Sequence, residues 1–191
     1  MLLFRHPIPN GWIDKIRAHL PAVLVDHAHL ERKAATTAIT LERYRPLFPC
    51  VRELNAIAIE ELQHFELVLQ LLERRGIPFG QPCRSPWISG LMGAIRSGNN
   101  HAQLIDHLIC CALIEGRSCE KFQVLAQALA SDDPELASFY AALVESEGNH
   151  YAAYLIMARH IDEPETARRL DWFLDLDAQL IREEHGLPIL H

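Results

Sequence analysis

The chain has 191 residues and a net charge of −7, and 49% of its residues are hydrophobic against 23% that are charged. This length suggests a single domain with a substantial core, and the composition is ordinary for a soluble globular protein. The apolar stretches are too short for a membrane span, and MLLFRHPIPNGW at the start is too short an apolar run for a signal peptide. Five cysteines without a CxxC pair indicate neither a disulfide framework nor a zinc ribbon, so we expect a cytoplasmic protein.

Prolines, glycines and capping residues divide the first half of the chain into helical segments. Asn10 can cap a short first helix, and Pro21 suits the first turn of a long helix that runs to about Tyr44. Pro49 is expected to open a second long helix, which Gly76 ends. The prolines and glycines after Gly76 predict a long connection up to residue 98, with a short helical turn at 87–95.

Two more long helices and a shorter one are predicted in the second half. The third long helix starts near Asn99 or Asn100, and Ser131 is expected to cap the fourth. A last helix opens at Asp162 and ends near Gly186. Four long helices with one long connection are typical of an all-α bundle with one crossover, here with additional N- and C-terminal helices.

A recurring pattern of glutamate and histidine marks these four helices. The motif Glu-x-x-His occurs in the middle of the second and fourth long helices, and the preceding long helix carries a single central glutamate each time. This is the ligand set of a carboxylate-bridged di-iron or di-manganese bundle, because carboxylates bridge two hard divalent cations and imidazoles complete their coordination. The alternative, glutamates paired with arginines and two histidines packed in the core, would bury charge at high cost. The six candidate ligands are Glu31, Glu61, His64, Glu115, Glu147 and His150.

Several residues beside these ligands are candidates for orienting them or for lining an oxygen or substrate pocket. Each lies next to a ligand in sequence or one helical turn from one. Ordinary core packing, or for one glutamate a solvent-facing charge, is the alternative. The candidates are His27, Glu60, Ser146, Cys119 and Tyr154.

Glycines follow two of the candidate ligands directly. Gly148 interrupts a helix and costs roughly 0.8–1 kcal/mol relative to alanine. We expect it to let neighbouring groups approach the site closely. Gly116 follows Glu115 in the same way.

Positive charge gathers in one segment of this acidic chain. Between Arg74 and Ile105 there are arginines and no acidic residue, which describes either a solvated loop or a surface for an anionic partner. The basic candidates in this segment are Arg74, Arg75, Arg84 and Arg96, and others on the long helices are Lys33, Arg117 and Lys121. Lys33 and Arg117 can instead balance carboxylates near the site.

The segments around the ligands resemble the MiaE family of bacterial tRNA 2-methylthio-isopentenyladenosine hydroxylases. The resemblance covers roughly residues 12–185 and extends beyond the ligand pattern itself. Family members have arginine and histidine where this chain has Ile59 and Phe65. The matching segments are DHAHLERKAA (26–35), EELQH (60–64), LLERRGIPF (71–79), LIEGRSCEKF (113–122) and SEGNHYAAYL (146–155).

This resemblance implies a single ferritin-like di-iron domain over residues 1–191 and assigns the same six ligands by matching positions. It implies a monooxygenase that uses two iron ions, dioxygen and an external electron donor to hydroxylate the isopentenyl group of an adenosine beside the anticodon. The partners expected are therefore tRNA, through its anticodon stem-loop, and an electron-transfer protein or reductase. The basic residues then become candidates for contacts with phosphates.

Other functions use the same ligands. A ferritin-like iron-storage or peroxide-scavenging protein needs no organic substrate, and a di-iron oxygenase can act on a small molecule or lipid instead of tRNA. A metal-free helical scaffold is a third reading. The ligand types suit iron and manganese alike.

Overall fold

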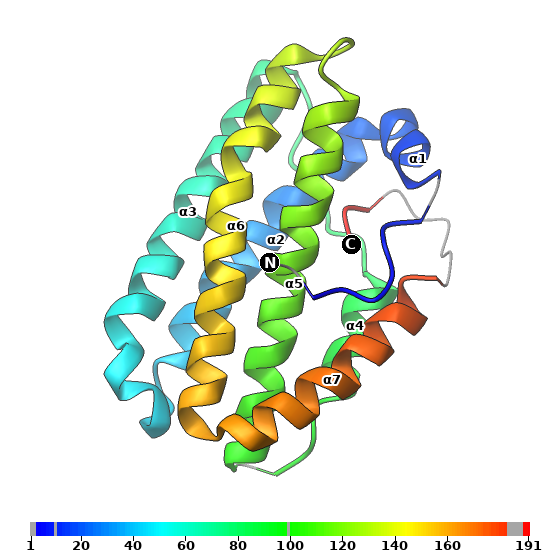
Figure 1. Cartoon of the computed structure of the whole chain (residues 1–191). Coiled ribbons are helices and arrows are strands. Elements are labelled where there is room, and N and C mark those ends of the chain that lie inside the picture. The colour runs from blue at the N-terminus through cyan, green and yellow to red at the C-terminus, as the bar shows by residue number, and fades with distance from the viewer. Residues whose placement is uncertain (1–2, 10, 99, 183–188) are drawn as a thin grey trace. The chain divides into compact units, whose positions relative to one another are not determined.

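The computed structural model describes residues 3–9, 11–98, 100–182 and 189–191. These residues form α-helices and one 3-10 helix, and they contain no strand, as the sequence predicted (Figure 1). None of the described helices has the length and apolar character needed to cross a membrane. The elements are α1 (Trp12–Ala18), α2 (Leu20–Leu41), the 3-10 helix η1 (Arg45–Cys50), α3 (Val51–Arg74), α4 (Pro86–Gly93), α5 (His101–Ala128), α6 (Pro134–Ile161) and α7 (Glu163–Leu180).

The chain divides into two compact units, which we describe separately. The α2–α3 unit comprises the described residues of Lys15–Arg84 and Leu187–Leu190, and its two long helices pack against each other. The α5–α6 unit comprises those of Met1–Asp14, Ser85–Gly186 and His191. In this unit α5 packs along α6, α7 contacts both helices, and α4 contacts α5 and α7. Each unit thus contains one pair of adjacent long helices.

Side-chain caps explain where the helices of the α5–α6 unit begin. The amide N–H groups of a first helical turn lack partners within the helix, and a short polar side chain can accept from one of them. Asn100 accepts from the amide of Gln103 at the start of α5, over 3.0 Å. Asp162 does the same for Glu165 at the start of α7, over 2.9 Å. Both positions confirm the predicted helix starts.

The end of α3 follows from one glycine. Gly76 has a φ of 64°, a left-handed conformation that glycine adopts without steric penalty. The amide of Gly76 donates to the carbonyl of Glu73, and the amide of Ile77 donates to that of Leu72. These two bonds form a Schellman motif, which satisfies carbonyl groups left open at the helix end. The prediction that Gly76 ends this helix is confirmed.

Other predicted boundaries need correction. Asp133, not Ser131, caps α6, because its carboxylate accepts from the amide of Leu136 over 3.1 Å. Pro49 lies inside the 3-10 helix η1, so α3 begins only at Val51.

The predicted end of the last helix is also too late, because α7 stops at Leu180. Gly186 itself lies outside the described part of the chain, as do Asn10 and Asn99, at which two other boundaries were predicted.

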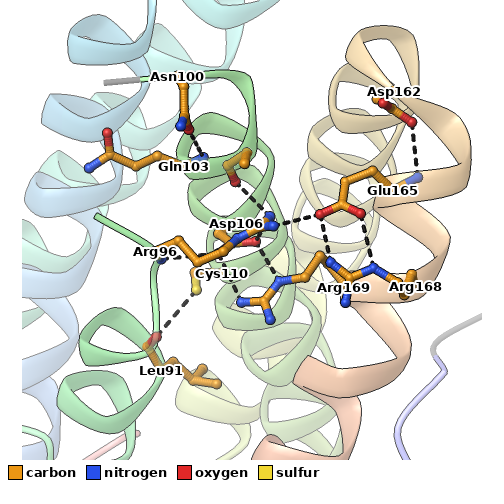
Figure 2. Close-up of polar contacts among 11 residues, drawn as sticks. Leu91, Arg96, Asn100, Gln103, Asp106, Cys110, Asp162, Glu165, Arg168 and Arg169 are labelled. Atoms are coloured by element: carbon orange, nitrogen blue, oxygen red, sulfur yellow. Dashed lines mark hydrogen bonds and ion pairs between the residues drawn. The ribbon is translucent and has the colours of Figure 1, made fainter. Parts of the chain in front are cut away.

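A buried carboxylate joins three segments of the α5–α6 unit (Figure 2). Asp106 on α5 is fully buried, and its carboxylate accepts from Arg169 on α7 over 2.7 and 2.8 Å. It also accepts from Arg96, which lies between α4 and α5, over 2.7 and 2.8 Å. Arg96 in turn pairs with Glu165 on α7. Because a buried charge is tolerated only when it is paired, this cluster requires the three segments to stay together.

The five cysteines are free thiols, in agreement with the predicted absence of a disulfide framework. Three of them, Cys110, Cys111 and Cys119, are buried on α5. Burial raises the pKa of each of these three thiols. They therefore pack as small apolar residues, as the sequence indicated.

Candidate metal centre

In the α2–α3 unit, Glu31 on α2 and the motif Glu61–His64 on α3 bring their side chains together. All three residues are buried, and each offers one ligand atom within 4.8 Å of those of the other two. Nδ1 of His64 lies 3.5 Å from a carboxylate oxygen of Glu31 and 4.0 Å from one of Glu61. The i, i+3 spacing on α3 makes this possible, since such residues project from one face of a helix.

His27 lies one turn before Glu31 on α2 and contacts it directly. Its ring is fully buried, and Nε2 is in hydrogen-bond contact with Oε1 of Glu31. Burial disfavours the ionised form of Glu31, but the charge of His27 and hydrogen bonds from His27 and His64 outweigh it. The pKa of Glu31 is therefore lowered well below its ordinary value of 4.5. An ionised carboxylate is the form that binds a cation.

The α5–α6 unit contains an equivalent group. Glu115 lies on α5, and the motif Glu147–His150 lies on α6. All three are buried, and each offers a ligand atom within 4.8 Å of those of the other two. Each compact unit thus presents two carboxylates and one imidazole, built from one single glutamate and one Glu-x-x-His motif.

The donor set of both groups suits a divalent transition metal. Carboxylate oxygen and imidazole nitrogen are the ligands that iron and manganese accept, and two carboxylates per unit balance the charge of one divalent ion. Carboxylates buried in this number are costly unless cations or hydrogen bonds compensate their charge. The burial, the spacing and the residue types therefore fit a metal at each group.

The remaining candidates, two for orienting the ligands and two for lining an oxygen or substrate pocket, occupy varied environments. The hydroxyl of Ser146 donates to the carbonyl of Leu143 over 2.8 Å, so its hydrogen is used within its own helix. The thiol of Cys119 contacts the carbonyl of Val144 over 3.4 Å, which ties α5 to α6. Tyr154 is buried, whereas Glu60 is half-buried on α3.

The expectation that Gly148 permits a close approach is wrong within this structure. A Cβ at Gly148 would meet only Sγ of Cys119, at an ordinary contact distance of 3.8 Å. The close approach occurs at Gly116 instead. There a Cβ would lie 2.8 Å from Cδ2 of Tyr151 and 2.9 Å from Cζ of Phe4. Gly116 thus allows Phe4 and the ring of Tyr151 to lie against α5.

Two of the cations predicted to contact tRNA are buried. Arg117 is fully buried and pairs with the buried Asp177 on α7, which also accepts from Nε1 of Trp87. Lys121 is 2% exposed, and its Nζ lies 3.2 Å from Nδ1 of His191. Neither side chain can reach a phosphate at the surface, so both predictions are corrected.

The other predicted cations lie closer to solvent. Arg96 is partly exposed, but its guanidinium is committed to Asp106 and Glu165. Arg74, Arg84 and Lys33 are exposed, and Arg75 is half-buried. These four remain candidates for a tRNA surface.

Comparison with known proteins identifies the family. The model of the family described as tRNA-(MS2IO6A)-hydroxylase (MiaE) matches residues 1–191. The chain belongs to the MiaE family. It is 36% identical over 178 residues to the tRNA 2-(methylsulfanyl)-N(6)-isopentenyladenosine(37) hydroxylase of Pseudomonas putida, with 92% of this chain and 85% of that protein covered. The enzyme of the same name from Salmonella typhimurium is 31% identical over 232 residues, with 95% and 84% covered.

A solved structure extends the comparison to three dimensions. It is described as Protein 43 with aldehyde deformylating oxygenase activity from Synechococcus, and it matches with a TM-score of 0.91 and 30% sequence identity. The match covers 100% of this chain and 96% of that one. The predicted all-α, ferritin-like fold class is therefore confirmed.

Proposed function

We propose that this protein hydroxylates the isopentenyl group of 2-methylthio-isopentenyladenosine next to the anticodon of tRNA. The observation that carries the proposal is the match of the MiaE family over residues 1–191, which includes both metal-binding groups. The reaction places the protein in the cytoplasm, where tRNA is modified. It functions in this proposal as one ferritin-like di-iron domain.

The proposed ligands of two iron ions are the six residues of the two groups. Bound iron would supply the activation of dioxygen, with electrons from an external donor such as a reductase. The chain contributes the rest. Helices α2, α3, α5 and α6 fix the donor atoms without loop entropy, and burial keeps water from the reacting groups. His27 holds Glu31 in its ionised form and fixes the orientation of its carboxylate.

Substrate recognition follows from the chemistry of an anticodon loop. Unpaired loop bases are accessible without the cost of opening a duplex, and the phosphates of the stem attract cations. The exposed Lys33, Arg74 and Arg84 and the half-buried Arg75 are the proposed phosphate contacts. Binding is then expected to weaken steeply as the salt concentration rises.

Nucleoside analysis tests this proposal. Transfer RNA that carries the methylthio-isopentenyl nucleoside is incubated with iron-loaded protein, oxygen and a reductant, then digested and separated. A new nucleoside heavier by one oxygen atom is expected, and the Glu115→Ala variant should not form it. Unchanged tRNA, with two irons per chain measured in the same sample, would refute the tRNA assignment and leave the metal site intact.

A second candidate function has a specific observation in its favour. The solved structure that matches this chain is named for aldehyde deformylating oxygenase activity. The same iron-loaded sample is therefore incubated with an aliphatic aldehyde, and formate is measured. Formate release without any tRNA product would favour an oxygenase of small molecules. An iron-storage protein would instead elute from a sizing column as a large shell.

A further inference from the structure

His29 on α2 is held in one orientation by both of its ring nitrogens. It is 4% exposed, and Nε2 donates to the carbonyl of Gly80 over 2.8 Å. Nδ1 accepts from the guanidinium of Arg32 over 3.1 Å. His29 lies two residues before Glu31, which places it about 200° around the helix, on the side of α2 away from that ligand. Each ring nitrogen of His29 therefore has a hydrogen-bond partner, and the ring points away from the proposed metal ligand Glu31.

The side chain of Phe79 packs against this fixed ring of His29. Its ring stacks on that of His29, with centroids 4.4 Å apart and planes at 27°. The ring of Phe65 on α3 meets it edge-on, with centroids 6.1 Å apart. Phe79 nevertheless remains 44% exposed. An aromatic ring supported on one side and open to solvent is a surface on which another flat ring can stack.

Two cations accompany this aromatic surface. Arg32 and Lys33 follow His29 by three and four residues, so they share its face of α2. Both are exposed, and neither pairs with a carboxylate among the residues that the structure describes. On a chain with a net charge of −7, two cations without acidic partners beside an exposed aromatic ring favour an anionic aromatic ligand.

We propose that Phe79 is a stacking platform for an unpaired base of the tRNA anticodon loop, with Arg32 and Lys33 contacting the adjacent phosphates. This inference rests on the proposed function. Single-stranded nucleic acids are commonly bound by aromatic side chains that stack on bases beside basic residues that follow the backbone. Because His29 faces away from Glu31 on α2, the stacked base is a neighbour of the reacting adenosine and not that adenosine itself.

The test measures binding of a synthetic anticodon stem-loop RNA that carries a fluorescent 2-aminopurine in its loop. Stacking on an aromatic side chain contributes enough that Phe79→Ala should weaken binding at least about fivefold. Phe79→Trp should keep the affinity of the wild type, because it keeps a flat aromatic ring. Phe79→Leu should bind as weakly as Phe79→Ala. Phe48→Ala is the matched control, since Phe48 is 59% exposed in the same unit. It should bind like the wild type.

Salt dependence separates the stacking contact from the phosphate contacts. Phe79→Ala should lower affinity equally at all salt concentrations and leave the slope of log K against log salt unchanged. Lys33→Gln should reduce that slope by about one, because it removes one phosphate contact. Arg32→Gln is less informative because Arg32 also supports His29.

The outcomes distinguish this inference from the proposed function. If the wild-type protein hydroxylates tRNA and Phe79→Ala binds RNA with unchanged affinity, the stacking proposal is wrong and the proposed function stands. A wild-type protein that neither binds the stem-loop nor modifies tRNA would overturn both. If Phe79→Ala slows reduction by an electron-transfer protein while RNA affinity is unchanged, the surface binds that protein and the base-stacking proposal is wrong.

Discussion

Gly116 on α5 lies beneath the ring of Tyr151 on α6, so close that a Cβ at position 116 would stand 2.8 Å from Cδ2 of Tyr151. Phe4 fills the other side of the same space, with Cζ at 2.9 Å. In the sequence, Gly116 directly follows Glu115, and Tyr151 directly follows His150. The absent side chain therefore sets how closely the N-terminal segment and α6 approach α5.

Replacing each of the two glycines beside ligands by alanine should change the free energy of unfolding in opposite directions. Gly116→Ala forces rigid rings to move, and overpacking costs about 1–3 kcal/mol, which exceeds the helix-propensity gain. Gly148→Ala has room and should raise the free energy of unfolding by up to about 1 kcal/mol. Denaturant unfolding of both variants measures the difference. Equal stability of Gly116→Ala and the wild type would show that Phe4 moves aside freely.

The ion-pair cluster in Figure 2 should make the protein sensitive to acid. Burial opposes ionisation of Asp106, but hydrogen bonds from Arg96 and Arg169 outweigh it, so its pKa lies below the ordinary value of 3.8. Hydrogen bonds from Arg168 and Arg96 lower the pKa of Glu165 from 4.5 to about 2. Both carboxylates stabilise the fold above their ordinary pKa and lose that contribution as the pH falls. The free energy of unfolding should therefore decrease between about pH 4.5 and 2.

Asp106→Asn tests this directly. It leaves Arg169 buried without its counter-charge, which typically costs 3–5 kcal/mol near neutral pH, and it should flatten the decline in acid. Asp171→Asn is the matched control because Asp171 is 73% exposed and pairs with Arg5 at the surface. Such a pair contributes only about 0–1 kcal/mol. An acid decline of unchanged steepness in Asp106→Asn would contradict the assignment.

Removal of Arg117 should affect stability and not RNA binding. Arg117→Met leaves the fully buried Asp177 without its guanidinium partner, so we expect a loss of about 3–5 kcal/mol in unfolding free energy. A second change, Asp177→Leu, should recover part of this loss because the buried charge is then gone. Stem-loop RNA affinity, measured well below the unfolding transition, should equal that of the wild type. A stable Arg117→Met variant with weakened RNA binding would restore Arg117 as a tRNA contact.

Loss of one proposed ligand should lower the bound metal. Glu147→Ala is expected to hold less than two irons per chain by elemental analysis, whereas Glu145→Ala, two residues away and exposed, should hold two. Ferrous or manganous ion at 100 times its Kd should stabilise the wild type by about 2.7 kcal/mol for each site it fills, and chelation should reverse this. The same metal content in both variants would exclude Glu147 as a ligand.

Local sequence signals predicted the helices well and indicated which glutamate and histidine side chains lie together. Gly76, Asn100 and Asp162 end or begin helices through bonds to residues within a few positions, so their roles are readable from the chain alone. The Glu-x-x-His motif on α3 is local in the same way, because helical spacing alone determines that both donors project together.

Contacts between distant residues were not readable in this way. Arg117 and Asp177 are both charged and pair across the unit, yet nothing in helical periodicity distinguishes a buried ion pair from two solvated side chains. The close approach predicted at Gly148 occurs at Gly116 for the same reason, because the rings that pack against Gly116 come from residues 4 and 151. His29 likewise binds Gly80, a partner beyond its helix.

The buried cysteines of α5 have a consequence for chemical durability. Thiolates react with oxidants much faster than thiols, and burial keeps the pKa of Cys110, Cys111 and Cys119 above the ordinary value of 9.0. In the proposed oxygen-dependent reaction, these three sulfur atoms would thereby stay in their unreactive form. Cys83, which is exposed, is the thiol that alkylating reagents should label first. It offers an attachment point for a spectroscopic probe four residues after Phe79 in the sequence.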